Sequence, residues 1–263
     1  MLHNLAQLVR YRGLIQSLVA RELKARYRGS VLGFFWSFIN PLLLLLIYSF
    51  VFSIVLPGTR PKEIEPFALF MFCGILPWTW FSSSLAESAG VILGSGNLVK
   101  KVLFPAEVLP TVTVLSNLVH FALGLPILLA FLAWNGKLTW MALALPLPML
   151  VQFVLSLGLA LFLSALTVHF RDVQNVLGHV LQVWFFATPV IYNYADIREG
   201  TALRSVLRLN PMTHVIVTYQ QIFFHGRVDH WRGLFLAFLV GVAAFAAGAF
   251  LFDRLRDTLP EEV

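Results

Sequence analysis

Charged residues are scarce in this sequence. Asp, Glu, Lys and Arg make up 12% of its 263 residues, whereas a soluble globular domain has about 25%. Hydrophobic residues account for 59% of the chain. This composition excludes an ordinary soluble domain and predicts an integral membrane protein. Cys73 is the single cysteine, which excludes an internal disulfide.

The motifs of catalysis and nucleotide binding are missing as well. The sequence has no G-x-x-x-x-G-K-[ST] phosphate-binding loop, and the stretch GSGNLVKK (Gly94–Lys101) places its glycines and lysines at other spacings. It also lacks paired carboxylates and nucleophile motifs, and its seven histidines show no metal-ligand spacing. We therefore expect no catalytic residue, no metal site and no cofactor in this chain.

Long apolar runs are what the sequence does contain. A helix needs roughly 20 apolar residues to cross the hydrocarbon core of a membrane. Six runs meet this requirement, so we predict an all-α integral membrane protein with six transmembrane helices. The predicted spans are Phe34–Leu56, Phe67–Glu87, Val108–Trp134, Trp140–His169, Val173–Tyr194 and Gly233–Phe252.

The positions of lysine and arginine predict the orientation of these spans. Six cations precede the first span, so that segment is expected in the cytoplasm, and six crossings return the C-terminus there. The net charge of +6 then reports topology and contact with membrane lipids rather than a nucleic-acid partner. One predicted outer loop, residues 195–232, conflicts with this pattern because it carries five arginines, at positions 198, 204, 208, 227 and 232.

The same loop contains an apolar stretch that is too short to cross the membrane. It reads NPMTHVIVTYQQIFFHG (Asn210–Gly226), with Asn-Pro and Gly as helix start and stop signals. Two interpretations remain open at this point. The stretch is either a re-entrant helix buried in protein or a surface helix lying flat at the outer interface.

Residues 10–28 form an amphipathic pattern before the first span. Cations recur on one helical face and apolar side chains on the other, which is typical of a helix lying in the membrane interface. Glu22 and Arg26 interrupt the apolar face and are expected to pair at i, i+4. The helix is either a topology anchor or a collar against a cytoplasmic partner. Its cationic face contains Arg10, Arg21, Lys24 and Arg28.

A second short helix is predicted over Leu98–Phe104, between the second and third spans. Asn97 is its expected N-cap and Pro105 ends it. Such a short helix is not stable alone in water. It is either a simple connector or a docking element with one face against the membrane domain and a basic-aromatic face, made by Lys100, Lys101 and Phe104, against a partner.

Taken together, the chain resembles the permease subunit of polysaccharide exporters of the ABC-2 type, which export O-antigen, capsule or teichoic acid. The resemblance runs nearly end to end, and the order of its pieces is more specific than any one of them. They are LVARELKARYRGSVLGFFWSFINPLLLLLIYSFVF (Leu18–Phe52), GILPWTWFSSSL (Gly74–Leu85), GNLVKKVLFPAEVLP (Gly96–Pro110), HFRDVQNV (His169–Val176), ATPVIYN (Ala187–Asn193) and LNPMTHVI (Leu209–Ile216).

The resemblance implies a domain organisation and a location. Residues 1–33 are then a cytoplasmic segment with the interface helix, residues 34–252 the six-helix membrane domain, and residues 253–263 a cytoplasmic tail. It further implies a coupling helix at 94–105 and re-entrant helices at 195–230. The protein would form a homodimer in the bacterial inner membrane, with both termini in the cytoplasm.

The resemblance also implies partners. Two ATP-binding cassette subunits would bind ATP and Mg²⁺ and drive transport. The residues expected to contact them are Leu98, Lys100, Lys101, Phe104 and Pro105. Arg171 and Asp172, after the fourth span, are either a second contact with these subunits or an interfacial salt bridge.

Aromatic residues near the first and fifth spans are candidates for the polysaccharide path, because in these exporters the first and fifth helices border the channel. Sugars stack on aromatic rings through their C–H surfaces. The alternative is that these side chains belong to ordinary interfacial belts. The candidates are Trp36, Phe38, Trp184, Phe185, Phe186, Tyr192 and Tyr194.

The expected cargo is an undecaprenyl-diphosphate-linked polysaccharide. The start RELKARYRGSVLGFFW (Arg21–Trp36) favours glycan over the alternative of an ABC-2 permease for a drug or another lipid. An integral membrane enzyme acting on lipid-linked sugars is disfavoured because the sequence has no acidic metal-binding or catalytic cluster. A further alternative is a membrane scaffold that transports nothing. An absence of partner-stimulated ATP turnover would favour that alternative.

Overall fold

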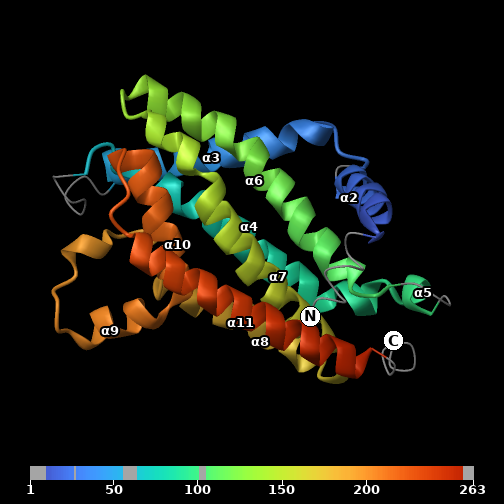
Figure 1. The fold of residues 1–263 in the computed structure, drawn as a ribbon. Coiled ribbons are helices and arrows are strands. Elements are labelled where there is room, and N and C mark those ends of the chain that lie inside the picture. Colours follow the sequence, from blue (N-terminus) through green and yellow to red (C-terminus); the bar gives the residue numbers. More distant parts are fainter. Residues whose placement is uncertain (1–9, 27, 56–63, 101–104, 257–263) are drawn as a thin grey trace.

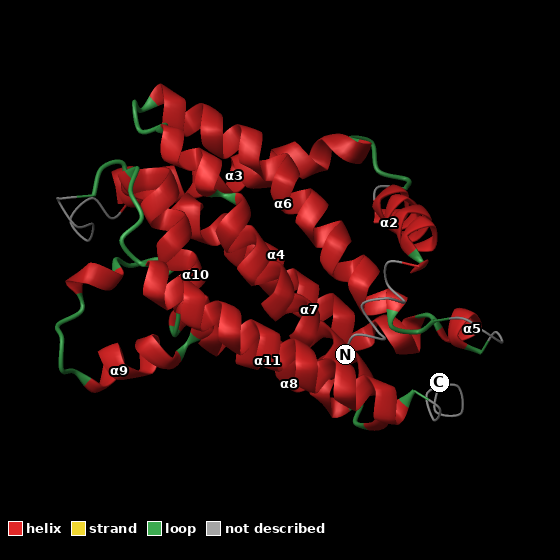
Figure 2. Ribbon diagram, in the orientation of Figure 1, coloured by secondary structure: helices red, strands yellow, loops and turns green. Residues whose placement is uncertain are grey.

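The computed structural model describes residues 10–26, 28–55, 64–100 and 105–256 (Figure 1). Throughout these ranges the regular structure is helical, without strands (Figure 2). The predicted all-helical membrane architecture is therefore confirmed at this level. Most of the predicted tail 253–263, together with residues 1–9 of the first predicted segment, lies outside the described residues.

The longer helices of the described residues run back and forth between two ends of the molecule (Figure 1). One end, which we call the α5 end, carries α2 (Arg12–Arg26), α5 (Gly96–Val99) and the turn between α7 and α8. The opposite end, the α9 end, carries α9 (Ala202–Leu209) and the connection between α6 and α7. The helices that do so are α3 (Trp36–Phe50), α4 (Phe67–Gly94), α6 (Val108–Trp134), α7 (Pro146–His169), α8 (Asp172–Phe186) and α11 (Trp231–Leu255).

Four helical segments are long and apolar enough to cross a membrane: Phe67–Gly94, Val108–Trp134, Trp140–His169 and Trp231–Leu255. They match the second, third, fourth and sixth predicted spans closely. The third of them combines the short 3-10 helix η3 (Trp140–Ala144) with α7.

The fifth predicted span is longer than its helix, whereas the first, Phe34–Leu56, agrees with the helical run of residues 33–55. α3 and α8 have 15 residues each, which is about 22 Å at the helical rise. α3 continues as a π-helical turn, η2 (Val51–Val55). α8 ends before Pro189, because proline lacks a backbone donor and disfavours helical geometry in the residue before it. The apolar sequence runs past this break, so hydropathy alone overestimates the helix length.

α4 is the centre of the packing and is buried over most of its length. It contacts α6, α7, α8 and α10. Near its middle, the Trp78 and Phe81 rings lie 5.6 and 5.1 Å from Phe185 and Trp184 of α8. These edge-to-face contacts attach α8 to the core.

α7 and α11 approach each other unusually closely, and small residues make this possible. A Cβ added at Gly158 would collide with the backbone of Ala244 and Phe245, and one added at Gly248 would meet the Gly158 carbonyl. Small residues of this kind let helix backbones approach in membranes, where packing replaces the hydrophobic effect as the force between helices.

Two further helices complete the α9 end. α9 begins at the N-cap Thr201, whose hydroxyl accepts a hydrogen bond from the Arg204 amide at 3.3 Å. α10 (Pro211–Gln220) continues into a π-helical turn, η5 (Gln221–His225), and Gly226 ends it in a left-handed conformation. The predicted start at Asn210-Pro211 and stop at Gly226 are both confirmed.

Candidate functional site

α5 is the candidate docking element. The helix begins at Gly96, one residue before the predicted N-cap Asn97, and the Ser95 carbonyl accepts hydrogen bonds from Leu98 and Val99 at 2.8 and 3.2 Å. The prediction of Asn97 as N-cap is therefore wrong, because the turn from α4 continues directly into α5 and places Asn97 inside the helix.

The side chains of α5 divide between the core and solvent. Val99 is buried and Leu98 half-buried, whereas Lys100 is exposed. Pro105, which follows the short segment, is buried. Lys101 and Phe104 lie outside the described residues. α5 thus has an apolar anchor in the membrane domain and a cation directed to solvent.

The predicted interface helix packs against α6. Ile15 and Leu18 of α2 are buried together with Val108 and Val112, on the first turns of α6. The cations assigned to the opposite face, Arg10, Arg21, Lys24 and Arg28, are all exposed. The division into faces follows the sequence pattern, but the apolar face meets protein within the same subunit.

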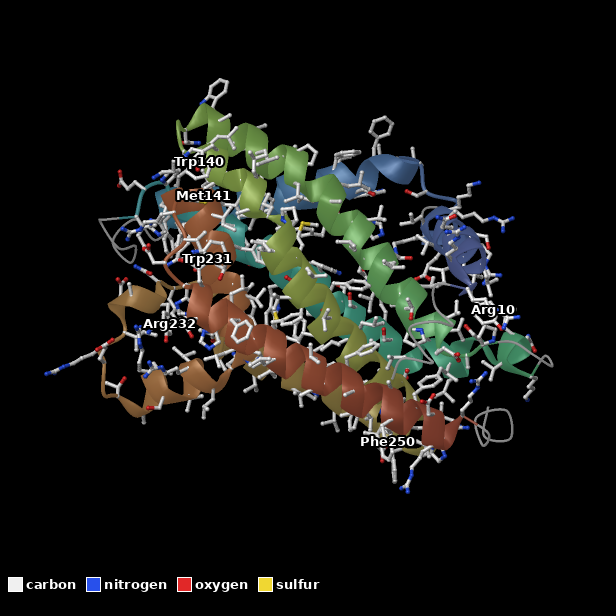
Figure 3. The ribbon with its side chains drawn as sticks, in the orientation of Figure 1. Arg10, Trp140, Met141, Trp231, Arg232 and Phe250 are labelled. Atoms are coloured by element: carbon white, nitrogen blue, oxygen red, sulfur yellow. The ribbon has the colours of Figure 1, made fainter. Side chains whose placement is uncertain are left out.

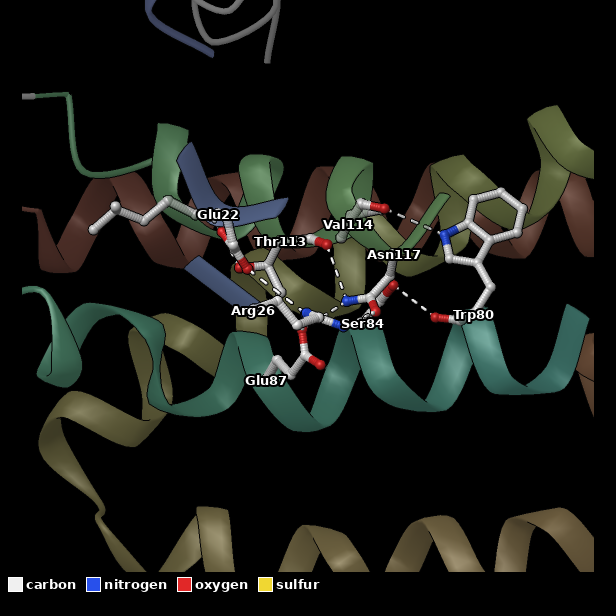
Figure 4. A network of polar contacts seen from close by, with 9 residues as sticks. Glu22, Arg26, Trp80, Ser84, Glu87, Thr113, Val114 and Asn117 are labelled. Carbon is white, nitrogen blue, oxygen red and sulfur yellow. Dashed lines mark hydrogen bonds and ion pairs between the residues drawn. The ribbon is translucent and has the colours of Figure 1, made fainter. Parts of the chain in front are cut away.

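A polar network ties α2 to α4 and α6 beside this contact (Figure 4). The Arg26 guanidinium lies 2.7 Å from the Glu87 carboxylate of α4, and Asn117 of α6 donates to the same carboxylate oxygen at 2.8 Å. Asn117 also donates to the Thr113 carbonyl at 3.1 Å. The predicted pair of Glu22 and Arg26 is present at 3.8 Å.

Sequence reasoning missed the role of Glu87 and Asn117. Glu87 is the single acid of α4, and a charged residue in an apolar helix usually has a specific partner. That signal could have indicated Glu87, but not that its partners lie 61 and 30 positions away. Burial, and then the nearby Glu87, raise the pKa of Glu22, while Arg26 lowers it.

One further ion pair and one exposed pair of charges complete the α5 end. Arg256, at the end of α11, lies 3.8 Å from Glu107, which is buried just before α6. Arg171 and Asp172 are exposed at the turn between α7 and α8. A shallow pocket beside them is lined by His169, Phe170 and Val173.

A cleft of about 480 Å³ opens beside the network, between α3, α4 and α6. Arg26 and Asn117 reach it from the network, and it has further polar walls from Asn40 and Thr79. The side of the cleft toward the α9 end is apolar, with Phe72 and Phe121. Such a cleft suits a molecule with one polar and one apolar part.

The seven predicted channel aromatics fall into two groups. Trp36 and Phe38 are half-buried on the first turn of α3, where the Trp36 indole donates to Ser30 at 3.0 Å. The other five belong to α8 and the segment after it, and Phe186 is the most exposed of them, at 58%. One subunit therefore does not bring all seven together. The second group comprises Trp184, Phe185, Phe186, Tyr192 and Tyr194.

Several members of the second group have structural partners. The Trp184 indole donates to Asn210 at 2.9 Å, and Phe185 packs against Trp78. Tyr192 donates to the Phe186 carbonyl at 3.0 Å. Tyr194 is buried beneath the Arg204 guanidinium, which lies 3.7 Å from the centre of its ring. Their role in a channel stays a prediction.

Comparison with known proteins identifies the family. Residues 13–224 match the model of the ABC-2 type transporter family. The chain is 40% identical over its whole length, and that of the relative, to the O-antigen export system permease protein RfbA of Myxococcus xanthus. It is 29% identical to an RfbA of Klebsiella pneumoniae over 94% of both chains. With the polysialic acid transport protein KpsM of Escherichia coli it shares 25% identity over 88% of this chain and 89% of the relative.

These matches cover the helices described above. The family model extends from the interface helix α2 through the core helices to η5. Two of these relatives are permease proteins of O-antigen export and the third is a polysialic acid transport protein, which agrees with the polysaccharide exporters that the motifs predicted. The chain therefore belongs to the ABC-2 type transporter family.

Proposed function

We propose that this chain is the membrane permease of an ATP-driven exporter, which moves an undecaprenyl-diphosphate-linked, O-antigen-like polysaccharide across the bacterial inner membrane. The observation that carries this proposal is the full-length similarity to permeases of O-antigen export. The permease catalyses no reaction itself. Two copies of it act with two ATP-binding subunits, which hold ATP and Mg²⁺.

In this proposal six helices cross the membrane, with both termini in the cytoplasm. The alternating directions of the six helices support this topology (Figure 1). Residues 36–55 are helical throughout, and roughly 20 helical residues reach about 30 Å, the thickness of the hydrocarbon core. The α5 end is the cytoplasmic one, since its loops carry the cations that the positive-inside rule requires. These are Arg10, Arg12, Arg21, Lys24, Arg26, Arg28, Lys100, Arg171, Arg254 and Arg256.

Residues 195–230 form the re-entrant region between the fifth and sixth crossings. Every residue of α10 from Met212 to Gln220 is buried. α10 also packs against α4, α7 and α11. A helix lying flat on the membrane would keep one face exposed, so this burial favours the re-entrant interpretation.

The α5 region, residues 94–105, couples the membrane domain to the ATP-binding subunit. Lys100 offers an exposed cation, and buried Val99 holds the helix to the membrane domain. A displacement of α5 reaches α4 directly, because Ser95 alone separates the two helices. The contact of Glu87 with Arg26 extends the path to α2. Closure of the ATP-binding subunits would thus move several helices together.

The polysaccharide passes between the two copies, along faces formed by α3 and α8. Exposed apolar and aromatic side chains on both helices support this path, with Phe50 and Phe186 among them. Such a surface would contact both the polysaccharide and the membrane lipid. Aromatic rings suit both, because sugar C–H groups stack on them and lipid tails pack against them.

Co-purification from native membranes tests this function. A tagged chain is isolated in mild detergent, and bound proteins and lipids are identified by mass spectrometry. We expect a stoichiometric ATP-binding subunit and a lipid-linked glycan. Lys100→Glu should lower recovery of the ATP-binding subunit at least tenfold, because the charge facing the partner is reversed.

Arg198→Glu is the matched control, since it makes the same charge change on an exposed side chain beyond the α9 end. Its recovery of the ATP-binding subunit should equal that of the unmodified chain. If that subunit is absent even after cross-linking at Lys100, the proposal is wrong. An ATP-binding subunit with a drug or simple lipid in place of glycan would support the alternative substrate class.

A further inference from the structure

The five arginines of residues 195–232 conflict with the positive-inside rule, and the structure offers a reason for them. Four of them line one cleft of about 1070 Å³ at the α9 end. Arg204 and Arg208 come from α9, Arg227 from the segment after η5, and Arg232 from the first turn of α11. Figure 3 shows Arg232 and Trp231 at this start of α11. Cations from three elements thus converge on one space.

The charge in the cleft is predominantly positive. Its acidic lining residues are Glu199 and Asp229, and Asp229 forms an ion pair with Arg227 at 3.1 Å. Arg208 and Arg232 are exposed at this cleft. Three arginines therefore face a single remaining carboxylate, and the planar guanidinium matches phosphate and carboxylate oxygens in pairs.

The base of the cleft is built from fixed groups. Arg204 donates to the Tyr194 carbonyl and stacks on the Tyr194 ring. The Arg208 carbonyl accepts a hydrogen bond from Nε2 of His214 at 3.0 Å. Because a carbonyl only accepts, His214 Nε2 carries the proton. Its Nδ1 then accepts from Nε2 of His230, at 2.7 Å, when both rings are neutral.

Gly233 makes room for this histidine pair, and the surrounding charges lower the pKa of His230. A side chain at Gly233 would collide with both rings, so its absence leaves the space that they occupy. Burial first, and then His214, Arg204 and Arg208, lower the pKa of His230 to about 4. His230 is therefore neutral near pH 7, and the arginines supply the positive charge of the cleft.

We infer that the cleft at the α9 end binds a phosphate-bearing group, through Arg208 and Arg232 at its rim and Arg204 at its base. Two sources supply this chemistry: the diphosphate of a lipid-linked glycan and the headgroup of an anionic membrane lipid. The volume of the cleft leaves room for a sugar or glycerol beside the phosphate. The site lies at the end opposite α5 and is independent of the docking of an ATP-binding subunit.

Binding of two probes to the purified full-length chain tests the inference. The first probe is inorganic pyrophosphate, titrated calorimetrically in an uncharged detergent. The second is phosphatidylglycerol in phosphatidylcholine nanodiscs, with retained lipid counted by native mass spectrometry. We expect the double variant Arg208→Gln with Arg232→Gln to weaken binding of the retained probe at least tenfold. Arg198→Gln, an exposed arginine of the same loop that does not line the cleft, should bind like the unmodified chain.

The two sources give different results. Pyrophosphate binding without lipid retention indicates the diphosphate of a carrier, whereas retained phosphatidylglycerol that pyrophosphate displaces indicates a headgroup. The inference is wrong if the unmodified chain binds neither probe, if the double variant binds as well as the unmodified chain, or if Arg198→Gln loses as much as the double variant. Both rim arginines are exposed, so the double variant should fold normally. No ATP-binding subunit is present, so the result does not depend on the proposed function.

Discussion

Glu87 shows how one charge can organise a membrane protein at the scale of a residue. A carboxylate in an apolar helix is costly unless it is paired. Here it accepts from Arg26 of α2 at 2.7 Å and from Asn117 of α6 at 2.8 Å. It therefore fixes two helices relative to α4, about two and a half turns before α5 begins at Gly96. A structural role and a role in coupling are both compatible with this position.

We predict that Glu87→Gln destabilises the protein. An amide keeps the shape but loses the charge-assisted bonds, which we estimate at about 1 kcal/mol because Arg26 and Glu87 are partly exposed. That corresponds to a fall in Tm of about 2–4 °C for a chain of this size. Thermal unfolding in detergent measures it. The matched control is Glu22→Gln, whose carboxylate lies farther from Arg26, at 3.8 Å, and an equal loss in both variants would contradict the prediction.

Asn210 marks the limit of what residue patterns reveal. The Asn-Pro pair predicted a helix start, and Asn210 does accept a hydrogen bond from the Met212 amide at 3.0 Å. The same side chain also accepts from Trp184 and donates to the Ala187 carbonyl, both more than 20 positions away. Local sequence encodes the cap because its geometry spans a few residues. The contact with α8 depends on the whole fold and leaves no periodic signal.

At the scale of elements, the contact between α7 and α11 depends on glycine. Lipid tails are as apolar as the side chains of both helices, so the hydrophobic effect does not drive the helices together. Close packing of small residues then decides which helices associate. Gly158 and Gly248 occupy the crossing point, and a Cβ at either would meet backbone, which cannot move aside as a flexible side chain can.

Gly158→Ala is therefore expected to destabilise the protein by about 2 kcal/mol, the size of a typical overpacking penalty. Thermal unfolding measures the loss of stability. Gel filtration shows whether the variant still elutes at the monomer or dimer position of the unmodified chain. Gly178→Ala on α8 is the matched control, because a Cβ there meets no atom within 4 Å, and alanine should leave its Tm unchanged or slightly raised. Equal stability of the Gly158 variant and the unmodified chain would show that the two helices can separate without cost.

The elements also show why some spans were predictable and others were not. The third and fourth predicted spans end with their helices, whereas the second stops at Glu87 although α4 continues to Gly94. In the fifth, ATPVIYN remains apolar while Pro189 has already ended α8. Hydropathy indicates whether a segment lies in an apolar environment. Where a helix ends depends instead on its backbone hydrogen-bond donors and on capping residues. The end of α8 was therefore not readable from hydropathy, although Pro189 signals it in the sequence.

At the scale of the whole molecule, the two ends differ in chemistry. The α5 end contains an exposed cation on a short anchored helix, and the α9 end contains a basic cleft. α3 and α8 connect the two ends and keep apolar stripes exposed in the single chain. On α8 the stripe is Val176, Val180, Val183 and Phe186. Exposure in lipid is ordinary for apolar residues, so the stripe by itself does not indicate a partner.

The proposed homodimer makes the α8 stripe testable. If two copies meet along α3 and α8, a cysteine at position 183 faces the other copy, whereas one at position 239, exposed on α11, faces lipid. We expect Val183→Cys to give a cross-linked dimer under mild oxidation in membranes, and Leu239→Cys to remain monomeric. Cys73 is buried and is replaced by alanine in both variants to remove the native thiol.

Both positions are apolar and exposed, Val183 at 69% and Leu239 at 47%. Random collisions in the membrane would therefore cross-link both to similar extents. A dimer band for position 183 alone supports a paired α8 face, because a disulfide forms only when the two Cβ atoms come within about 4.5 Å. A dimer band for position 239 alone would place the interface on α11 and would move the proposed polysaccharide path away from α3 and α8.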